Sequence, residues 1–334
     1  MDEVAPRPVL AIDLGGTQIR AAHISPDRSI SCRRAVPTRD EAGPEAVVDR
    51  ICRLAEEVLD AARDAGLPPP VGIGISAPGP LDQRAGVVLA PPNLAGWHDV
   101  PLVRLVEERL GLPTFLERDT NVAVMAEWRH GAASDASDVV YVTVSTGIGG
   151  GLVVDGRPLY GRDGSAGEIG HLTVDLDGPA DGDGGAGHVE AIASGTGIER
   201  AARQLLDRGR AAGLAALLDG SDEVTAELVA KAADEGDADC RAVMDRAVEA
   251  LGATLAGLVN VLNPEVIVIG GGIAEHRPQL LEAARAEIDR RAFPIPARRV
   301  RLERPRFGGD VSLIGALPIV NERMHEAAAG GHRS

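Results

Sequence analysis

Lysine is almost missing from this sequence: of its 34 basic residues, only Lys231 is a lysine. The GxxxxGK[ST] phosphate loop, the protein-kinase active site and the Ser-x-x-Lys nucleophile all need a lysine at a fixed place in a motif. The sequence holds none of these motifs. A protein of this sequence that handles phosphate must therefore use backbone amides, arginine or a metal ion.

Aromatic residues and positive charge are also scarce. Aromatics make up only 2% of the chain, and the net charge is −16. Few side chains can therefore stack on bases, and the overall charge repels a phosphate backbone. We expect no nucleic-acid partner, although a small anion could still find a local basic site.

Cysteines and long apolar runs are the remaining scarce features. Cys32, Cys52 and Cys240 lie far apart with no CxxC pair, which fits a reducing compartment and neither a disulfide framework nor a thiolate metal site. The acidic, proline-containing start is not typical of a signal peptide, and no apolar run reaches the ~18 residues that span a bilayer. We expect a cytoplasmic protein without a membrane partner.

What is present indicates an α/β protein of two domains. With 334 residues, 44% of them apolar, the chain is long enough for two cores. Short apolar strands alternate with helical periodicity, which is typical of the α/β class. Strands are predicted at 9–14, 19–24, 71–75, 114–116, 139–144, 152–154, 172–174, 265–269 and 299–303. Helices are predicted at 43–66, 100–110, 119–130, 196–218, 224–235, 238–262, 277–291 and 311–327.

The sequence contains one internal repeat. The segments VLAIDLGGTQIRAA and VVYVTVSTGIGGGLVV each read as an apolar strand, a Thr/Gly turn and a returning strand. Glycines in such turns let a backbone approach a phosphate and turn its N–H groups toward it. A plain hairpin explains either turn alone, but a third glycine junction at Gly270–Gly272 favours a nucleotide site over three hairpins.

Acidic residues and histidines follow these turns. Asp119 stands where a strand meets a helix, so it is either a helix cap or a general base at the strand's carboxyl end. Glu168, His171, His188 and Glu190 lie in glycine-rich loops. They suit the recognition of sugar hydroxyls, because carboxylate oxygens accept several O–H bonds. A solvated acidic loop is the alternative.

At this point the residues resemble the ROK family of repressors and sugar kinases. The segments DLGGTQIRAA, ISAPGPLD, PNLAGW, ERDTNVAVMAE, STGIGGGLVVDGRPLYGRDGSAGEIGH and EAIASGTGI stand in the family's order, from about Val9 to Ala316. The resemblance implies the actin-like ATPase (ribonuclease H-like) fold, with two α/β domains around a cleft. We expect a smaller domain of residues 1–118 with 311–334, and a larger one of residues 119–310.

The resemblance also implies roles for single residues. Asp119 matches the family's catalytic base, which takes the proton from a sugar hydroxyl. The positions that match sugar-binding residues are Gly79, Glu168, His171 and Glu190. The positions that match ATP-binding motifs are Asp13, Gly15, Gly16, Thr17, Thr146, Gly147 and Gly271. Asp13 is also placed to hold Mg²⁺ through water.

The sequence departs from the family pattern at two places. Arg118 replaces the asparagine that usually precedes the catalytic aspartate, so it either binds the substrate or is structural. Asp181, Asp183 and His188 stand beside His171 where most members hold zinc with three cysteines. Because exposed carboxylates hold zinc less firmly than thiolates, we expect no tightly bound zinc.

The resemblance, taken with these residues, implies an ATP-dependent hexose kinase that phosphorylates the 6-hydroxyl, and we expect glucose to be the substrate. Mannose or an N-acetylhexosamine is the alternative within the family, polyphosphate is an alternative donor, and a sugar-sensing protein with weak catalysis is the alternative outside the enzymes. The repressor branch carries a DNA-binding domain before the first glycine turn, and only about eight residues precede Val9 here. We expect ATP and a hexose as ligands and a homodimer or homotetramer as the assembly.

Overall fold

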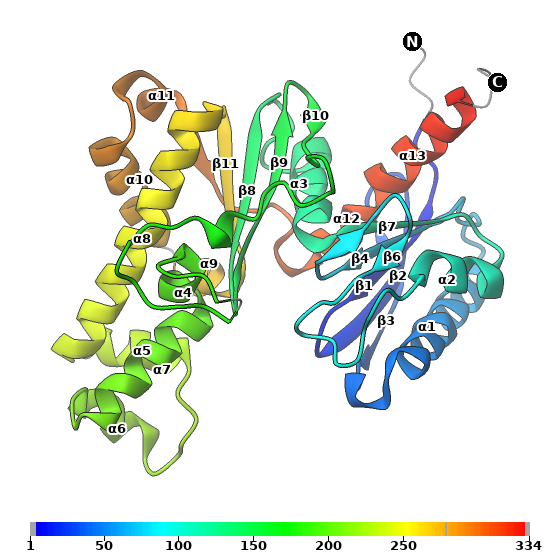
Figure 1. The fold of residues 1–334 in the computed structure, drawn as a ribbon. Helices are drawn as coiled ribbons and strands as arrows, with labels where there is room; N and C mark the ends of the chain where they lie inside the picture. Colours follow the sequence, from blue (N-terminus) through cyan, green and yellow to red (C-terminus); the bar gives the residue numbers. More distant parts are fainter. Residues whose placement is uncertain (1–4, 183, 278, 331–334) are drawn as a thin grey trace. The chain divides into compact units, whose positions relative to one another are not determined.

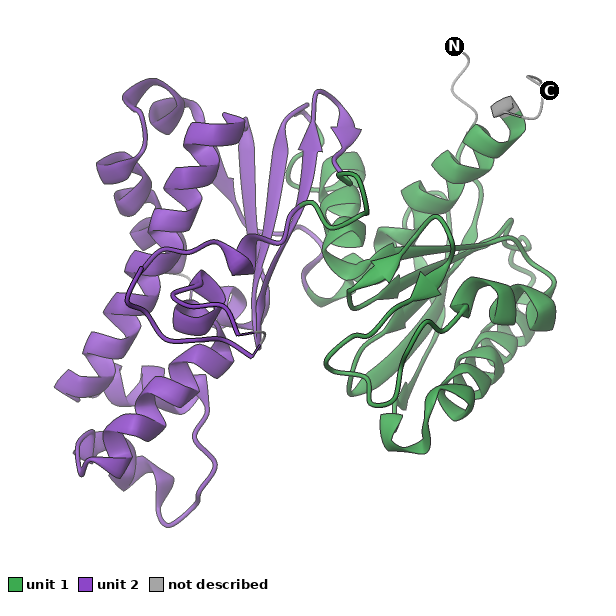
Figure 2. Cartoon of the chain, viewed as in Figure 1, with its two compact units in different colours: residues 1–134, 160–166, 309–334 green, residues 135–159, 167–308 purple. Residues whose placement is uncertain are grey.

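The computed structural model describes residues 5–182, 184–277 and 279–330, and its ribbon is shown in Figure 1. The chain forms two compact units (Figure 2). Unit 1 comprises residues 1–134, 160–166 and 309–334, and unit 2 comprises residues 135–159 and 167–308. Within the described parts of the chain, no helix is both long and apolar enough to cross a bilayer.

Unit 1 is built on a five-stranded sheet of order β3-β2-β1-β4-β7. Strand β1 pairs antiparallel with β2 and parallel with β4, and β4 pairs parallel with β7. The strands are β1 (Val9–Leu14), β2 (Gln18–Ile24), β3 (Ile30–Pro37), β4 (Ile73–Ala77) and β7 (Thr114–Arg118). A small hairpin is formed by β5 (Leu81–Asp82) and β6 (Val87–Val88).

Helices cover both faces of this sheet. Alternate strand residues point to opposite faces: Ile73 and Ile75 join the apolar core that contains α1, whereas a Cβ atom on Gly74 would stand 2.7 Å from Cβ of Ala316 in α13. The glycine therefore lets α13 lie close against the strand. The helical elements of unit 1 are η1 (Asp40–Ala42), α1 (Pro44–Asp64), α2 (Leu102–Leu110), α3 (Asp119–His130), α12 (Val311–Ile314) and α13 (Ala316–Gly330), and η3 (Gly308–Asp310) lies at a unit boundary.

Unit 2 repeats the plan with a sheet of order β10-β9-β8-β11-β12. Here β8 pairs antiparallel with β9 and parallel with β11, as β1 does with β2 and β4. The strands are β8 (Val139–Val144), β9 (Ile148–Val154), β10 (Arg157–Pro158), β11 (Val266–Gly270) and β12 (Arg301–Glu303). The internal repeat predicted from the sequence is therefore confirmed as two matching strand-turn-strand units.

Helices of unit 2 pack their apolar residues on this sheet. The long helix α8 (Ala238–Leu262) is capped at its N-terminus by Asp237, whose carboxylate accepts hydrogen bonds from the N–H groups of Asp239 and Cys240. Its Leu251 and Leu255 share a core with Val140 and Val142 of β8. The other helical elements are η2 (Ile169–His171), α4 (Val189–Ala193), α5 (Gly195–Asp207), α6 (Ala212–Leu218), α7 (Ala226–Asp234), α9 (Gly272–His276), α10 (Leu280–Arg291) and α11 (Pro294–Arg299).

Several predicted elements differ from the structure. The strand expected at 172–174 is wrong: Thr173 forms only an isolated bridge to His188 after the short helix η2. The helix expected over 196–218 is two helices, α5 and α6, because the chain turns at Gly209 with a positive φ of 70°. Strand β3 is absent from the predictions, since its residues are mostly half-buried or exposed and show no apolar run.

The first boundary between the two compact units lies at 134/135, whereas the sequence analysis expects a domain boundary at 118/119. Helix α3 belongs to unit 1 because it packs against α12 and α13. The domain bounds taken from the family resemblance stay a prediction.

Candidate active site

The first glycine turn joins β1 to β2 in unit 1. Its shape is fixed by hydrogen bonds from Gly15 N–H to the carbonyl of Gln18 (3.0 Å) and from the Thr38 hydroxyl to the carbonyl of Gly15 (2.6 Å). Gly16 is half-buried and Thr17 is exposed. The backbone of the turn can thus meet an anion from solvent.

Asp13 precedes this turn and is paired with an arginine. Both Nε and one terminal nitrogen of Arg20 donate to the same oxygen, Oδ2 of Asp13, at 2.9 and 2.6 Å. Arg20 also donates to the Ser312 hydroxyl at 2.9 Å. Because both bonds use Oδ2, Oδ1 is the oxygen that can accept from the water shell of a Mg²⁺ ion. The carboxylate therefore fits the outer-shell role expected for it.

Asp119 lies at the same edge of this sheet. The register aligns Asp13 with Ser76 and Ser76 with Glu117, so β1, β4 and β7 end together. Asp119 follows β7 directly as the first residue of α3 and is exposed. Its Oδ1 accepts a 2.7 Å hydrogen bond from the N–H of Thr120. An ionisable, solvent-facing carboxylate at the carboxyl end of parallel strands can remove a proton from a bound hydroxyl.

Arg118 is buried immediately before Asp119. A terminal nitrogen donates to the carbonyl of Ala166 at 2.5 Å, and a Cβ atom on Gly79 would stand 3.3 Å from its Cδ. The side chain is 6% exposed. Arg118 therefore connects three segments of unit 1.

The second glycine turn joins β8 to β9 in unit 2. Thr146 is exposed, and its carbonyl accepts hydrogen bonds from the backbone N–H of Thr196 (3.2 Å) and from its hydroxyl (2.9 Å). Glu190 of α4 lies against the turn, because its Oε2 accepts from Ile148 N–H at 2.7 Å. The start of helix α5 thus packs on the turn, which the sequence analysis did not anticipate.

The third junction, at Gly271, lies beside the second. Gly271 has a φ of 92°, and a Cβ atom there would stand 2.5 Å from the carbonyl oxygen of Val144. A cavity of about 420 Å³ adjoins helix α9, which begins at the next residue. Residues lining it include Ile198, Ala230, Lys231, Met244, Ile273 and Arg277. The lining also includes Glu227, Asp234, Glu235 and His276, and Arg277 pairs with Asp234 at 2.6 Å. Unit 2 therefore places a cavity lined by apolar residues and by charges of both signs next to the Gly271 junction.

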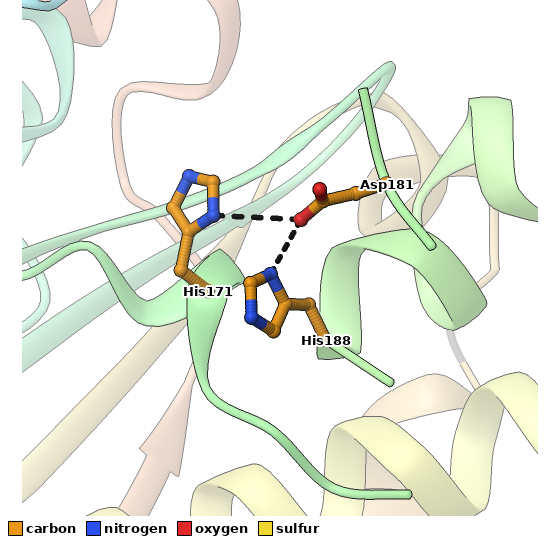
Figure 3. Close-up of side chains that lie close together, drawn as sticks. All are labelled: His171, Asp181 and His188. Atoms are coloured by element: carbon orange, nitrogen blue, oxygen red, sulfur yellow. Dashed lines mark hydrogen bonds and ion pairs between the residues drawn. The ribbon is translucent and has the colours of Figure 1, made fainter. Parts of the chain in front are cut away.

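The remaining predicted sugar residues lie in the glycine-rich loop of unit 2. Glu168 is exposed and precedes η2, and His171 ends it. His171 and His188 both turn Nδ1 toward the carboxylate of Asp181, as Figure 3 shows. Their rings pack edge to face at 5.3 Å between centroids. The structure thus brings His171 into a cluster with two of the residues that stand at the family's zinc positions.

This cluster offers the donor types of a metal site but is arranged as a hydrogen-bonded group. Two imidazole nitrogens and a carboxylate oxygen lie within 4.8 Å of one another. Ligands on a tetrahedral zinc ion at ~2.0 Å stand roughly 3.3 Å apart. His188 Nδ1 instead contacts Asp181 Oδ2 directly as a hydrogen-bond partner, and His171 Nδ1 is 3.6 Å from the same oxygen. Asp183 lies outside the described residues. The described residues therefore supply three donor groups that also contact one another through Asp181 Oδ2.

The sequence analysis also missed a buried polar group beneath Asp119. Glu117 is 1% exposed, and its Oε1 accepts hydrogen bonds from Asn121 Nδ2 (2.9 Å) and Arg118 N–H (3.0 Å). Burial raises the pKa of the Glu117 carboxyl, and these hydrogen bonds oppose that shift. The signal in the sequence was the spacing of four residues between Glu117, at the end of the strand, and Asn121, in the helix that follows.

Comparison with known proteins places these features in one family. The family model described as ROK matches residues 9–323. The chain belongs to the ROK family. Among its ROK relatives, a glucokinase of Thermotoga maritima is 34% identical, covering 95% of this chain and 98% of that protein. An N-acetylmannosamine kinase of Salmonella typhi is 35% identical, covering 92% and 96%.

Solved ROK structures show the same fold. A ROK hexokinase from Thermus thermophilus has a TM-score of 0.77 at 37% identity, covering 93% of this chain and 96% of the other. A ROK glucokinase from Streptomyces griseus, solved with glucose and AMPPNP, has a TM-score of 0.77 at 32% identity, covering 93% and 98%. The family resemblance and the actin-like ATPase fold class predicted from the sequence are confirmed.

Proposed function

We propose that this protein is a glucokinase that transfers the γ-phosphoryl group of ATP to the 6-hydroxyl of glucose. The observation that carries the proposal is the exposed carboxylate of Asp119, held at the edge of the sheet where β1, β4 and β7 end. ROK relatives named glucokinase over nearly the whole chain support it.

In the proposed reaction Asp119 accepts the proton of the sugar 6-hydroxyl. The sugar oxygen bonds to the γ-phosphorus while the bond from that phosphorus to the bridging β–γ oxygen breaks, and ADP leaves. Such a reaction needs positioning and charge stabilisation more than covalent help from the protein.

The three glycine junctions are proposed to bind ATP. Backbone N–H groups of the turns at Gly15–Thr17 and Thr146–Gly147 would donate to phosphate oxygens. Gly271 and the cavity beside α9 would take the adenosine, because an apolar wall suits a purine ring. Magnesium bound with ATP neutralises charge on the β- and γ-phosphates, and Asp13 is placed to accept from its water shell.

The residues proposed to bind the sugar hydroxyls are Gly79, Arg118, Glu168, His171 and Glu190. One carboxylate oxygen of Glu190 is held by a hydrogen bond from the Ile148 N–H. The other oxygen remains able to accept from a sugar hydroxyl. The proposed function requires no zinc.

N-acetylmannosamine is the second candidate substrate. Kinases named for this sugar are as similar to the chain as the glucokinases are. Arg118, which only donates hydrogen bonds, suits an acetamido carbonyl oxygen as well as a hydroxyl oxygen. The recognition of the substituent at C2 of the sugar therefore distinguishes glucose from N-acetylmannosamine as the substrate.

The proposal extends to location and assembly. We place the protein in the cytoplasm, where ATP is available, and expect a homodimer or homotetramer. Exposed apolar side chains gather where α8 meets α11, with Val261 at 81%, Phe293 at 64% and Ile295 at 58% exposure. Such a patch favours self-association. Light scattering on the purified protein measures the assembly.

A coupled assay of ADP release tests the substrate assignment. Glucose, mannose, N-acetylglucosamine and N-acetylmannosamine are compared at equal concentration, each with ATP and with polyphosphate as donor. We expect the highest kcat/KM with glucose and ATP. A higher value with an N-acetylhexosamine would replace the substrate, and no turnover with any pair would reject the kinase assignment.

A further inference from the structure

The carboxylate of Glu117 closes the strand-to-helix turn that carries Asp119. Its Oε1 accepts a hydrogen bond from the backbone N–H of Arg118, the residue before Asp119, and one from the side chain of Asn121, two residues after it. Arg118 caps the helix start without any side-chain hydrogen bond. The Glu117 side chain therefore supplies the bracing of this turn.

The other oxygen of Glu117 connects the turn to distant segments of unit 1. Its Oε2 lies 3.4 Å from a terminal nitrogen of Arg323 in α13. The Arg323 guanidinium in turn lies 5.6 Å from the ring centroid of Tyr160. Tyr160 begins the 160–166 segment, whose Ala166 carbonyl accepts from Arg118. Both residues that precede Asp119 are thus tied to the body of unit 1.

Stability alone does not account for this buried group. A buried ion pair loses the solvation of both charges, and apolar replacements of similar volume are often as stable or more so. Burial raises the pKa of the Glu117 carboxyl, so the fold opposes its ionisation, while Asn121, the Arg118 N–H and Arg323 favour it. What the group gains is geometry, because its Oε1 holds the backbone N–H of Arg118 before Asp119 and the side chain of Asn121 after it.

We propose that Glu117 and Asn121 are positioning residues that hold the Asp119 carboxylate in its reactive orientation. The inference rests on the proposed role of Asp119 as the base. Neither residue touches the substrate in this assignment. They act through the turn, where a displacement of about 1 Å in a reacting group is enough to cost ~10²-fold in rate.

Three variants and one matched control test the proposal. Glu117→Ala removes both hydrogen bonds, Glu117→Gln keeps an oxygen acceptor, and Asn121→Ala removes one donor while leaving the Glu117–Arg323 pair in place. Glu127→Gln is the control: this carboxylate is fully buried on the same helix, roughly 12 Å along it from Asp119, and accepts from the N–H of Ala132 at 2.8 Å.

We expect the loss in kcat to depend on whether the residue contacts the turn that carries Asp119, and not on how deeply the residue is buried. Glu117→Ala and Asn121→Ala should lower kcat by about 10- to 100-fold, with KM for glucose and ATP within about twofold and Glu117→Gln intermediate. Glu127→Gln should lower the melting temperature but leave kcat per folded molecule unchanged. Equal kcat losses at residues 117 and 127, or a kcat of Asn121→Ala like that of the wild type, would overturn the proposal.

A double-mutant cycle separates this inference from the proposed function. If Asn121 acts through Asp119, adding Asn121→Ala to Asp119→Asn should lower kcat little further, because the group that it positions is already lost. Equal losses in both backgrounds would show that Asn121 acts elsewhere, even if Asp119 is the base. Near-normal turnover of Asp119→Asn alone would instead reject the base assignment.

Discussion

The Oε2 oxygen of Glu190 accepts a 2.7 Å hydrogen bond from the backbone N–H of Ile148, and a Cβ atom on Gly147 would stand 2.6 Å from that same oxygen. A carboxylate proposed to bind the sugar therefore rests directly on a turn proposed to bind phosphate. These two parts of the proposed site in unit 2 are therefore in direct contact, and a side chain at residue 147 would disturb both.

Gly147→Ala should therefore weaken the binding of both substrates. The added methyl group must displace the Glu190 carboxylate or the turn itself, and losing one hydrogen bond to a charged group corresponds to about 10-fold in affinity. We expect KM to rise about 10-fold for glucose and for ATP, measured by initial rates with both varied. Gly257→Ala, with open space around its exposed helical position, is the control that should change neither. A variant with only one KM raised would show that the two parts are independent.

Asp119→Asn should keep sugar binding and lose turnover. The amide keeps the size of the carboxylate but cannot accept the hydroxyl proton, and general-base assistance contributes ~10² or more to the rate. We expect kcat to fall by at least ~10²-fold while the Kd for glucose, measured by calorimetry, stays within a few-fold. Asp64→Asn, at the exposed end of α1, is the matched control and should behave as the wild type.

Much of the fold and part of the site were accessible from sequence because local signals determine them. The strand-turn-strand repeat was visible because glycines interrupt apolar runs at equivalent places, and β1, β2 and β8 stand within one residue of their predicted positions. Strand β9 begins at Ile148, earlier than the predicted residue 152, because the glycine run itself pairs with β8. Asp119 was correctly placed at a strand-helix junction because the apolar pattern changes period there. Its chemical role stays a prediction.

The features that could not be predicted depend on contacts between residues far apart in the sequence or on the tertiary surroundings of a segment. The contact of Glu117 with Arg323 joins residues 206 positions apart, which no local pattern reveals. Strand β3 carries Arg33 and Arg34 on an exposed edge, so its pairing with β2 is set by tertiary contacts rather than by an apolar run. The packing of α5 on the second glycine turn is equally non-local, since it rests on hydrogen bonds from residues 195 and 196 to 145 and 146.

Asp237→Ala should destabilise unit 2 in a pH-dependent way. Hydrogen bonds from backbone N–H groups, that of Cys240 first, lower the pKa of Asp237 below its ordinary 3.8. A lowered pKa in the folded state adds stability above the unfolded pKa, and that stability is lost as the pH falls through the folded value. Loss of the cap should cost about 1 kcal/mol at pH 7, measured by urea unfolding. The difference in unfolding free energy between the variant and the wild type should shrink below pH 3.8. The control is Asp245→Ala, at an exposed position on the same helix, and its difference from the wild type should not change with pH in this way.

The cluster of His171, Asp181 and His188 should hold little zinc. Asp181 already accepts from His188, so a metal would have to displace that hydrogen bond. We expect well below one zinc per chain by elemental analysis of protein purified without added metal. One tightly held zinc per chain, lost in His188→Ala, would contradict this expectation and show that carboxylate and imidazole replace the family's thiolates here.

Arg118→Ala tests the position where the chain departs most informatively from its family. The buried guanidinium donates to the carbonyl of Ala166. As a cation with five N–H groups, it is chemically suited to donate to a sugar oxygen or a transferring phosphate as well. If one of them binds the sugar, loss of a charge-assisted hydrogen bond should raise the glucose KM by ~10-fold or more. Arg118→Lys keeps the charge but not the planar fork, so it should recover only part of the affinity. Steady-state kinetics and thermal melts on both variants separate the two roles of Arg118. An unchanged KM with a lower melting temperature would assign it to the link between β7 and the 160–166 segment.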